Sequence, residues 1–131
     1  MLPLCRDQGI GVIPWSPLAR GFLAGNRSRD GEAQTTRAKS DANILTPSAF
    51  REGDYEIRDR VDAMAKERGV TSAQVALAWL LHQPVVTAPI VGASKMKHLD
   101  DAIAAVNVRL SDDEVKGLSK GYQTRRIMGH Q

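Results

Sequence analysis

The sequence contains a single cysteine, Cys5, so no disulfide bond can form within the chain. This scarcity is typical of a reducing compartment, and we therefore expect the protein in the cytoplasm. Long hydrophobic runs are missing as well. No apolar stretch approaches the ~20 residues that a membrane-spanning helix needs, so we expect no membrane partner.

Aromatic residues and net charge are also scarce. Aromatic residues make up 5% of the chain, and its net charge is only +3, from 18 basic and 15 acidic residues. A nucleic-acid-binding domain usually carries a strong basic surplus and a recognition motif, and this sequence has neither. The arginine-rich stretch 20–39 is the one feature that favours such binding, but a solvated loop explains it more simply. We therefore expect no nucleic-acid partner.

The most informative feature that is present is the stretch 86–101. Its apolar, β-branched beginning predicts a buried strand at Val86–Val91, and the small residues from Gly92 predict a tight turn. An amphipathic helix follows, because Leu99 and Ile103 fall on one helix face. The stretch is therefore predicted to form a strand–turn–helix unit.

The turn of this unit is a candidate phosphate site. Backbone N–H groups at a helix start have no partner within the helix, and the helix dipole favours an anion there. Ser94 can add a hydroxyl group, and Lys95 and Lys97 can add positive charge. We therefore predict that this turn binds a phosphate group. Plainer interpretations stay open, with Ser94 as the helix N-cap and the lysines as a solvated pair.

The first part of the chain predicts a helix, a strand and a turn. Residues 2–9 are typical of the end of a helix, and Ile10–Trp15 of a short strand. Residues 16–21 then predict a turn or a helix start. In that start, Ser16 is the expected N-cap and Pro17 the expected first-turn residue.

The second part is more regular and predicts three helices besides the one after Val91. Residues 54–68 predict a helix that ends at Gly69. The capping boxes Thr71–Gln74 and Ser111–Glu114 predict the starts of the others. The helix after Thr71 is apolar almost all round, so we expect it to be buried on most sides, with Trp79 in the core.

Only two convincing strands, Ile10–Trp15 and Val86–Val91, result from this assignment, and the polar loop 25–53 lies between them. A loop of that length in a compact domain is usually functional or disordered. Two strands do not make a stable parallel sheet, because parallel strands are normally covered on both faces within larger sheets. We therefore infer that the chain is part of a larger α/β structure, either as a piece of one or by pairing with another chain.

The order and spacing of several motifs resemble the aldo-keto reductases, most closely the bacterial oxidoreductases related to the potassium-channel β subunits. The motifs are GVIPWSPLARG at 11–21, TTRAK at 35–39, PIVGASK at 89–95 and HLDD at 98–101. The resemblance implies a (β/α)8 TIM barrel, NADPH as the cofactor and reduction of aldehydes or ketones. Such a barrel needs about 250 residues. The resemblance therefore implies an incomplete barrel, the C-terminal portion with strands 7 and 8 and their helices.

Under this interpretation, residues 1–131 form one C-terminal part of an aldo-keto reductase domain. Its expected segments are strand 7 and its turn (9–24), a cofactor-covering loop (25–53), helices (54–83), strand 8 with the phosphate turn and a helix (85–106), and the C-terminal helix and tail (111–131).

The resemblance also implies which residues contact NADP(H). Those at the end of strand 7 and in its turn lie along the nicotinamide and pyrophosphate: Trp15, Ser16, Pro17, Leu18, Ala19 and Arg20. Arg37 corresponds to a loop arginine near the adenosine phosphate. Those around the adenosine ribose, its 2′-phosphate and the adenine are Gly92, Ser94, Lys95, His98 and Asp101. For Trp15, an ordinary packed aromatic at a strand end is the alternative.

The resemblance implies no catalytic residue in this chain. The family uses an Asp, a Tyr, a Lys and a His on earlier barrel strands, and no metal. We therefore expect the chain alone to be inactive, with a small carbonyl compound as the substrate of the intact protein. The alternative is a non-catalytic half-barrel that self-associates or pairs with another chain and keeps dinucleotide affinity.

Overall fold

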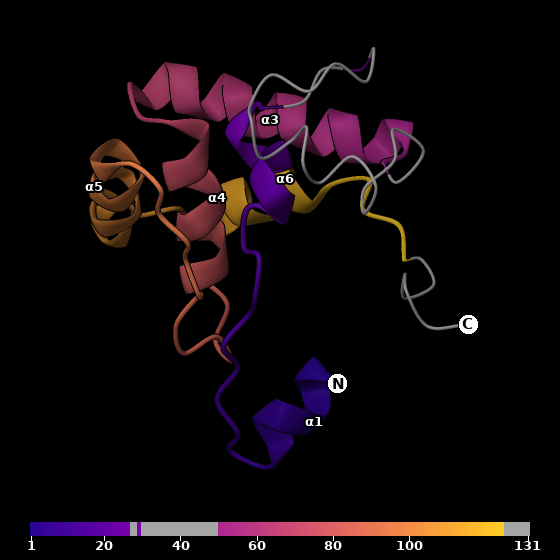
Figure 1. Ribbon diagram of the computed structural model, residues 1–131. Helices are drawn as coiled ribbons and strands as arrows, with labels where there is room; N and C mark the ends of the chain where they lie inside the picture. The colour runs from indigo at the N-terminus through magenta and orange to yellow at the C-terminus, as the bar shows by residue number, and fades with distance from the viewer. Residues whose placement is uncertain (27–28, 30–49, 125–131) are drawn as a thin grey trace.

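The computed structural model describes residues 1–26, residue 29 and residues 50–124 (Figure 1). The elements are α1 (Leu2–Asp7), the 3-10 helix η1 (Ala19–Ala24), α3 (Glu52–Arg68), α4 (Ser72–Leu81), α5 (Met96–Ala104), the 3-10 helix η4 (Ala105–Asn107) and α6 (Asp112–Ser119). Helices α3 to α6 lie together, whereas α1 stands apart from them (Figure 1). Most of the predicted loop 25–53 lies outside the described residues.

The two stretches predicted as strands lie side by side and run parallel. Val12 is bridged to Val86 and Trp15 to Ile90, but the described residues contain only these isolated bridges and no continuous strand. Three backbone hydrogen bonds join the stretches. The N–H of Val12 donates to Val85 O (2.9 Å), and the N–H groups of Thr87 and Ile90 donate to Val12 O (2.8 Å) and Pro14 O (3.0 Å). We call residues 10–15 and 85–90 the paired segments.

The hydrophobic core forms where α3, α4 and α6 meet. Its buried residues are Val61, Ala65, Val75, Ala76, Ala78, Leu110 and Leu118. Trp79 is only partly buried, because its indole N–H turns to the polar edge of the core and donates to Ser119 Oγ (3.1 Å). Leu81 is 37% exposed, so α4 is less enclosed than its apolar sequence predicts.

Local end signals locate most of the helices correctly. The Thr71 hydroxyl accepts a hydrogen bond from the N–H of Gln74, and the Ser111 hydroxyl accepts one from Glu114, which confirms both capping boxes. Gly69 ends α3 in the left-handed conformation, with φ of 64°.

Ser16, the predicted N-cap, and Ser94, the N-cap left open as an alternative, do not cap a helix. Ser16 does not cap a helix, because its φ of 53° is left-handed and an N-cap residue is normally extended. The 3-10 helix η1 begins later, with Leu18 as its N-cap. Ser94 is likewise one residue too early, since α5 has the extended Lys95 as its N-cap.

Helix α5 exposes the apolar face that the sequence predicts for it. Leu99 and Ile103 on this face are 42% and 60% exposed, and Val106 in the following η4 is 57% exposed. Large apolar side chains of the paired segments are exposed too, namely Ile10, Ile13, Trp15 and Ile90. Isolated surface apolar residues are common, but several on neighbouring elements indicate an unfilled contact.

An arginine bridge joins the end of α3 to the start of α6. The Arg68 guanidinium donates to Arg109 O (2.9 Å) and is hydrogen-bonded to Glu114 Oε1. Glu114 Oε2 also accepts from the backbone N–H of Ser111 (2.7 Å). The Arg68 guanidinium, followed by the Ser111 N–H, lowers the pKa of Glu114 to about 2.

This bridge predicts a pH-dependent contribution to stability. Because the folded-state pKa of Glu114 lies below its ordinary value of 4.5, its contribution is complete above that value and is lost as the pH falls towards about 2. Glu114→Gln should therefore be less stable than the wild type at neutral pH, and the difference should shrink on acidification. Denaturant unfolding over this pH range measures it. A constant difference at every pH would contradict the assignment.

Candidate functional site

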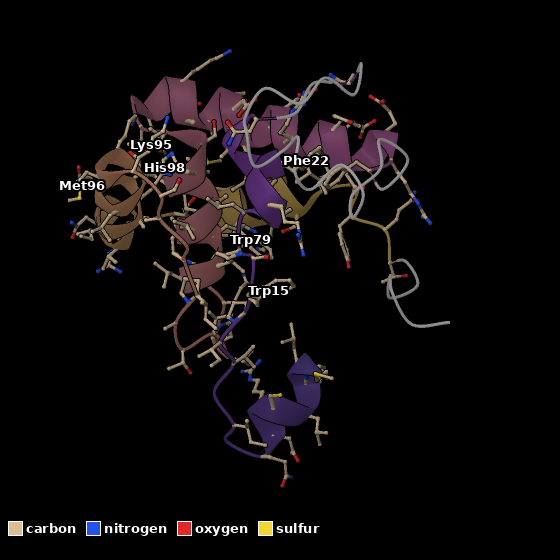
Figure 2. The ribbon with its side chains drawn as sticks, viewed as in Figure 1. Trp15, Phe22, Trp79, Lys95, Met96 and His98 are labelled. Carbon is tan, nitrogen blue, oxygen red and sulfur yellow. The ribbon has the colours of Figure 1, made fainter. Side chains whose placement is uncertain are left out.

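The parallel register brings two turns to the same end of the paired segments. Trp15 lies opposite Ile90, so residues 16–21 and 92–95 both follow the carboxyl ends of their segments. We call these two stretches the first and second corner. In parallel α/β structures, ligands bind beyond the carboxyl ends of the strands. Figure 2 shows Trp15 at the top of its segment and Lys95 and His98 at the start of α5.

The backbone of the first corner has unusual φ values, and some of its N–H groups are already hydrogen-bonded. Ser16, Ala19 and Arg20 have φ values of 53°, 47° and 56°, a left-handed conformation that non-glycine residues rarely adopt. Such strain is often found at functional sites. The N–H groups of Ala19 and Gly21 donate to Ser16 O (2.9 Å) and Leu18 O (3.0 Å). These two amides are therefore engaged within the corner.

Trp15 directly precedes the first corner, and Arg20 of the corner lies beside it. Trp15 is 69% exposed, so the alternative of an ordinary packed aromatic at a strand end does not hold. The guanidinium carbon of Arg20 lies 5.2 Å from the ring centroid, which is within cation–π range. Pro17 and Leu18 are half-buried, and Leu18 packs against the hydrophobic core. The corner thus offers a flat aromatic surface next to a positive charge.

The second corner is open. Residues 92–95 are exposed, and none of their N–H groups donates a backbone hydrogen bond within the described part of the chain. Lys95, the N-cap of α5, makes no side-chain capping hydrogen bond. Free N–H groups followed by a helix start are a favourable place for an anion. Gly92, Ser94 and Lys95 therefore lie in a geometry that a phosphate could use.

Two lysines lie at the start of α5, Lys95 as its N-cap and Lys97 in its first turn, and their surroundings differ. Lys97 Nζ lies 3.1 Å from Asp101 Oδ2, one helix turn away, so its charge is shared with that carboxylate. Lys95 makes no salt bridge with any described residue and is exposed. His98 is also exposed, one turn above the corner (Figure 2). Of the two lysines, Lys95 is the better candidate for binding an anion.

Arg37, the remaining predicted contact, lies outside the described residues. At the described edges of the same loop, the structure shows a cluster that the sequence analysis does not predict. Arg29 contacts Glu52 and Asp59, and its guanidinium carbon lies 5.3 Å from the centroid of the Tyr55 ring. The spacing of these three residues places them on one face of α3. That signal was available in the sequence, but nothing in it identifies Arg29 as their partner.

Other site types find no support in the described residues. No group of three or more His, Cys, Asp or Glu side chains there could hold a metal ion. None of the helices in this part of the chain has the length and apolar character to cross a membrane.

Comparisons with known proteins agree on one family. The model of the aldo/keto reductase family matches residues 1–122. The chain is 40% identical over 130 residues to a versiconal hemiacetal acetate reductase of Aspergillus parasiticus, covering 97% of the chain and 36% of that protein. It is 39% identical to an aldo-keto reductase of Fusarium vanettenii, covering 99% of the chain and 34% of that protein.

A solved structure is similar as well. The crystal structure of the thermostable aldo-keto reductase Tm1743 with the inhibitor epalrestat superposes with a TM-score of 0.61 at 25% identity, over 92% of this chain and 33% of that one. The chain thus spans about a third of the length of the relatives it matches. Because the family model accounts for nearly the whole chain, the chain belongs to the aldo/keto reductase family.

Proposed function

We propose that this chain is the C-terminal, NADP(H)-binding portion of an aldo-keto reductase that reduces aldehydes or ketones to alcohols. In this proposal, the paired segments are strands 7 and 8 of a (β/α)8 barrel, and the single cysteine fits a reducing compartment such as the cytoplasm. The observation that carries it is the parallel register, which sets both corners at one end of the segments. Family membership supports the same function.

The residues of the two corners fit a dinucleotide. The second corner has a hydroxyl, an exposed ammonium group and N–H groups that donate to no backbone carbonyl among the described residues, all available for a phosphate. The first corner has an exposed aromatic ring for a planar ring system and a guanidinium beside it. Bound NADPH would supply the hydride for carbonyl reduction. The role of this chain is then to bind and orient the cofactor.

Residue by residue, the proposal keeps the contacts implied by the resemblance and ranks them by geometry. Lys95 and Ser94 bind the 2′-phosphate, with the N–H groups from Gly92 onwards. His98 lies near the adenine. Asp101 is half-buried and already pairs with Lys97, so a contact of Asp101 with the adenine competes with that pair.

A charge reversal at Lys95 tests the phosphate contact. The 2′-phosphate is present in NADP⁺ and absent in NAD⁺, so Lys95→Glu should weaken NADP⁺ binding far more than NAD⁺ binding. One charge-assisted contact corresponds to roughly 1.5–3 kcal/mol, or about tenfold to a hundredfold in Kd. Titration calorimetry with each nucleotide measures the effect. Lys97→Glu is the matched control and should change NADP⁺ binding less. Equal losses for NADP⁺ and NAD⁺ would remove the assignment.

The chain alone should show no reductase turnover. The family's catalytic Asp, Tyr, Lys and His have no counterpart at matching positions here, so a bound cofactor would face no general acid. Consumption of NADPH with an aromatic and an aliphatic aldehyde is the measurement. A titration showing NADP⁺ binding in the same preparation separates missing chemistry from missing cofactor. NADPH consumption faster than in a control without protein would refute the prediction.

A second candidate function is a non-catalytic half-barrel that self-associates. The observation that favours it is the set of exposed apolar side chains on the paired segments, α5 and η4: Ile13, Trp15, Ile90, Leu99, Ile103 and Val106. Exposed apolar side chains that gather into one patch are a common feature of association interfaces.

Sedimentation of the purified chain tests this candidate. A stable oligomer that weakens on Ile103→Asp, with unchanged helix content by circular dichroism, would support association through α5. Lys116→Asp, an exposed change on α6, is the control and should leave the oligomer intact. A folded monomer at all accessible concentrations would exclude the candidate.

A further inference from the structure

An ion pair on the first turns of α5 follows the second corner directly. Lys97 Nζ lies 3.1 Å from Asp101 Oδ2 and 3.4 Å from Asp101 Oδ1, so the ammonium group contacts both carboxylate oxygens. The two residues are one helix turn apart, the spacing that places side chains on the same helix face. Among the described residues, the Asp101 carboxylate has no other hydrogen-bond or ion-pair partner.

The two members of this pair differ in their exposure to water. The Lys97 side chain is 71% exposed, whereas that of Asp101 is only 18% exposed. The Lys116–Asp113 pair on α6 is different, because its charged atoms are 3.8 Å apart and both side chains are mostly exposed. A partly buried charge is screened less by salt and water than an exposed one. Asp101 therefore depends on Lys97 more than Asp113 depends on Lys116.

The start of α5 carries two positive and two negative side chains. Figure 2 shows Lys95 at the start of this helix, and Lys97, Asp100 and Asp101 follow it. Asp100 is exposed, so water screens its charge. Asp101 lies six residues beyond Lys95, which corresponds to about 9 Å along the helix axis. The Debye length at physiological salt is about as long, so the charge of Asp101 acts on an anion bound at Lys95.

We propose that Lys97 determines cofactor specificity through Asp101 and favours a nucleotide with a 2′-phosphate over one with a free 2′-hydroxyl group. The inference rests on the proposed function, in which the second corner binds the adenosine end of NADP(H). Lys97 is a positioning residue in this proposal and does not touch the phosphate. It neutralises a carboxylate that would otherwise repel the phosphate.

The chemistry of the two nucleotides gives the direction of this preference. The 2′-phosphate of NADP⁺ is an anion, whereas the 2′-hydroxyl group of NAD⁺ is neutral and can donate a hydrogen bond. An unpaired carboxylate nearby opposes the phosphate and favours the hydroxyl group, and dinucleotide-binding folds that select NAD use an acidic side chain at the ribose in this way. With Asp101 neutralised by Lys97, the positive charge of Lys95 decides the preference.

The expected effect of Lys97 is smaller than that of a direct contact. A unit charge acting on a phosphate over about 9 Å of screened, water-exposed surface corresponds to about twofold to fivefold in affinity. The direct contact assigned to Lys95 corresponds to about tenfold or more. Lys97 thus adjusts a preference that Lys95 establishes.

The experiment measures the Kd of NAD⁺ divided by the Kd of NADP⁺, by titration calorimetry on the full chain. The variants are Lys97→Gln, Asp101→Asn and the double variant that combines them. The ratio is used because a contact of Asp101 with the adenine changes both dissociation constants alike and cancels. Lys116→Gln is the matched control, since it removes the exposed lysine of a lysine–carboxylate pair on another helix. Circular dichroism checks the helix content of each variant.

Lys97→Gln should lower this ratio about twofold to fivefold at low salt, and the decrease should shrink as salt is added. The double variant should recover the wild-type ratio, because it also removes the charge that Lys97 neutralises. Asp101→Asn alone should not lower the ratio, and Lys116→Gln should leave it unchanged.

The outcomes separate this inference from the proposed function. A double variant with a ratio as low as that of Lys97→Gln would overturn the inference, because Lys97 would then act on the phosphate directly. An unchanged ratio in Lys97→Gln would overturn it while the proposed function stands. An equal decrease in Lys116→Gln would reduce the effect to the overall charge of the chain. If the wild-type chain binds neither nucleotide, the proposed function fails, and the inference fails with it.

Discussion

The pairing of residues 10–15 with residues 85–90 is the constraint on which the rest of the site depends. Three backbone hydrogen bonds and two bridges set its register. A slip of one residue would exchange the faces on which the side chains of a segment lie. It would also move Trp15 away from its position opposite Ile90. The register, more than any single side chain, makes two turns from distant parts of the sequence follow the same end of the paired segments.

Helix α3 contacts both the 3-10 helix η1, which begins in the first corner, and the helices of the core. Its apolar side packs on α4 and α6, while charged side chains on its other sides form salt bridges with residues outside the helix. Arg68 binds Glu114 at one end, and Glu52 and Asp59 bind Arg29 towards the other. One helix therefore carries the contacts of the core and those of Arg29.

The packing of the molecule is uneven. Val75 is completely buried in the core, whereas Ile103 on α5 and Ile13 on the paired segments are about 60% exposed. Parallel strands and their helices are normally covered on both faces. In the described part of the chain, the apolar face of α5 and the apolar side chains of the paired segments lack such cover. The relatives are about three times as long as this chain.

The sequence by itself determined the features that depend on neighbours along the chain. Thr71 and Ser111 start helices because their hydroxyls reach an N–H three residues ahead, and Gly69 ends one because it tolerates a left-handed backbone. The order of the motifs likewise identified the family. Only the tertiary structure decided the features that need distant partners. Ser16 is left-handed rather than a cap, and Arg29 finds its carboxylates on α3, because packing between remote segments overrides local preference.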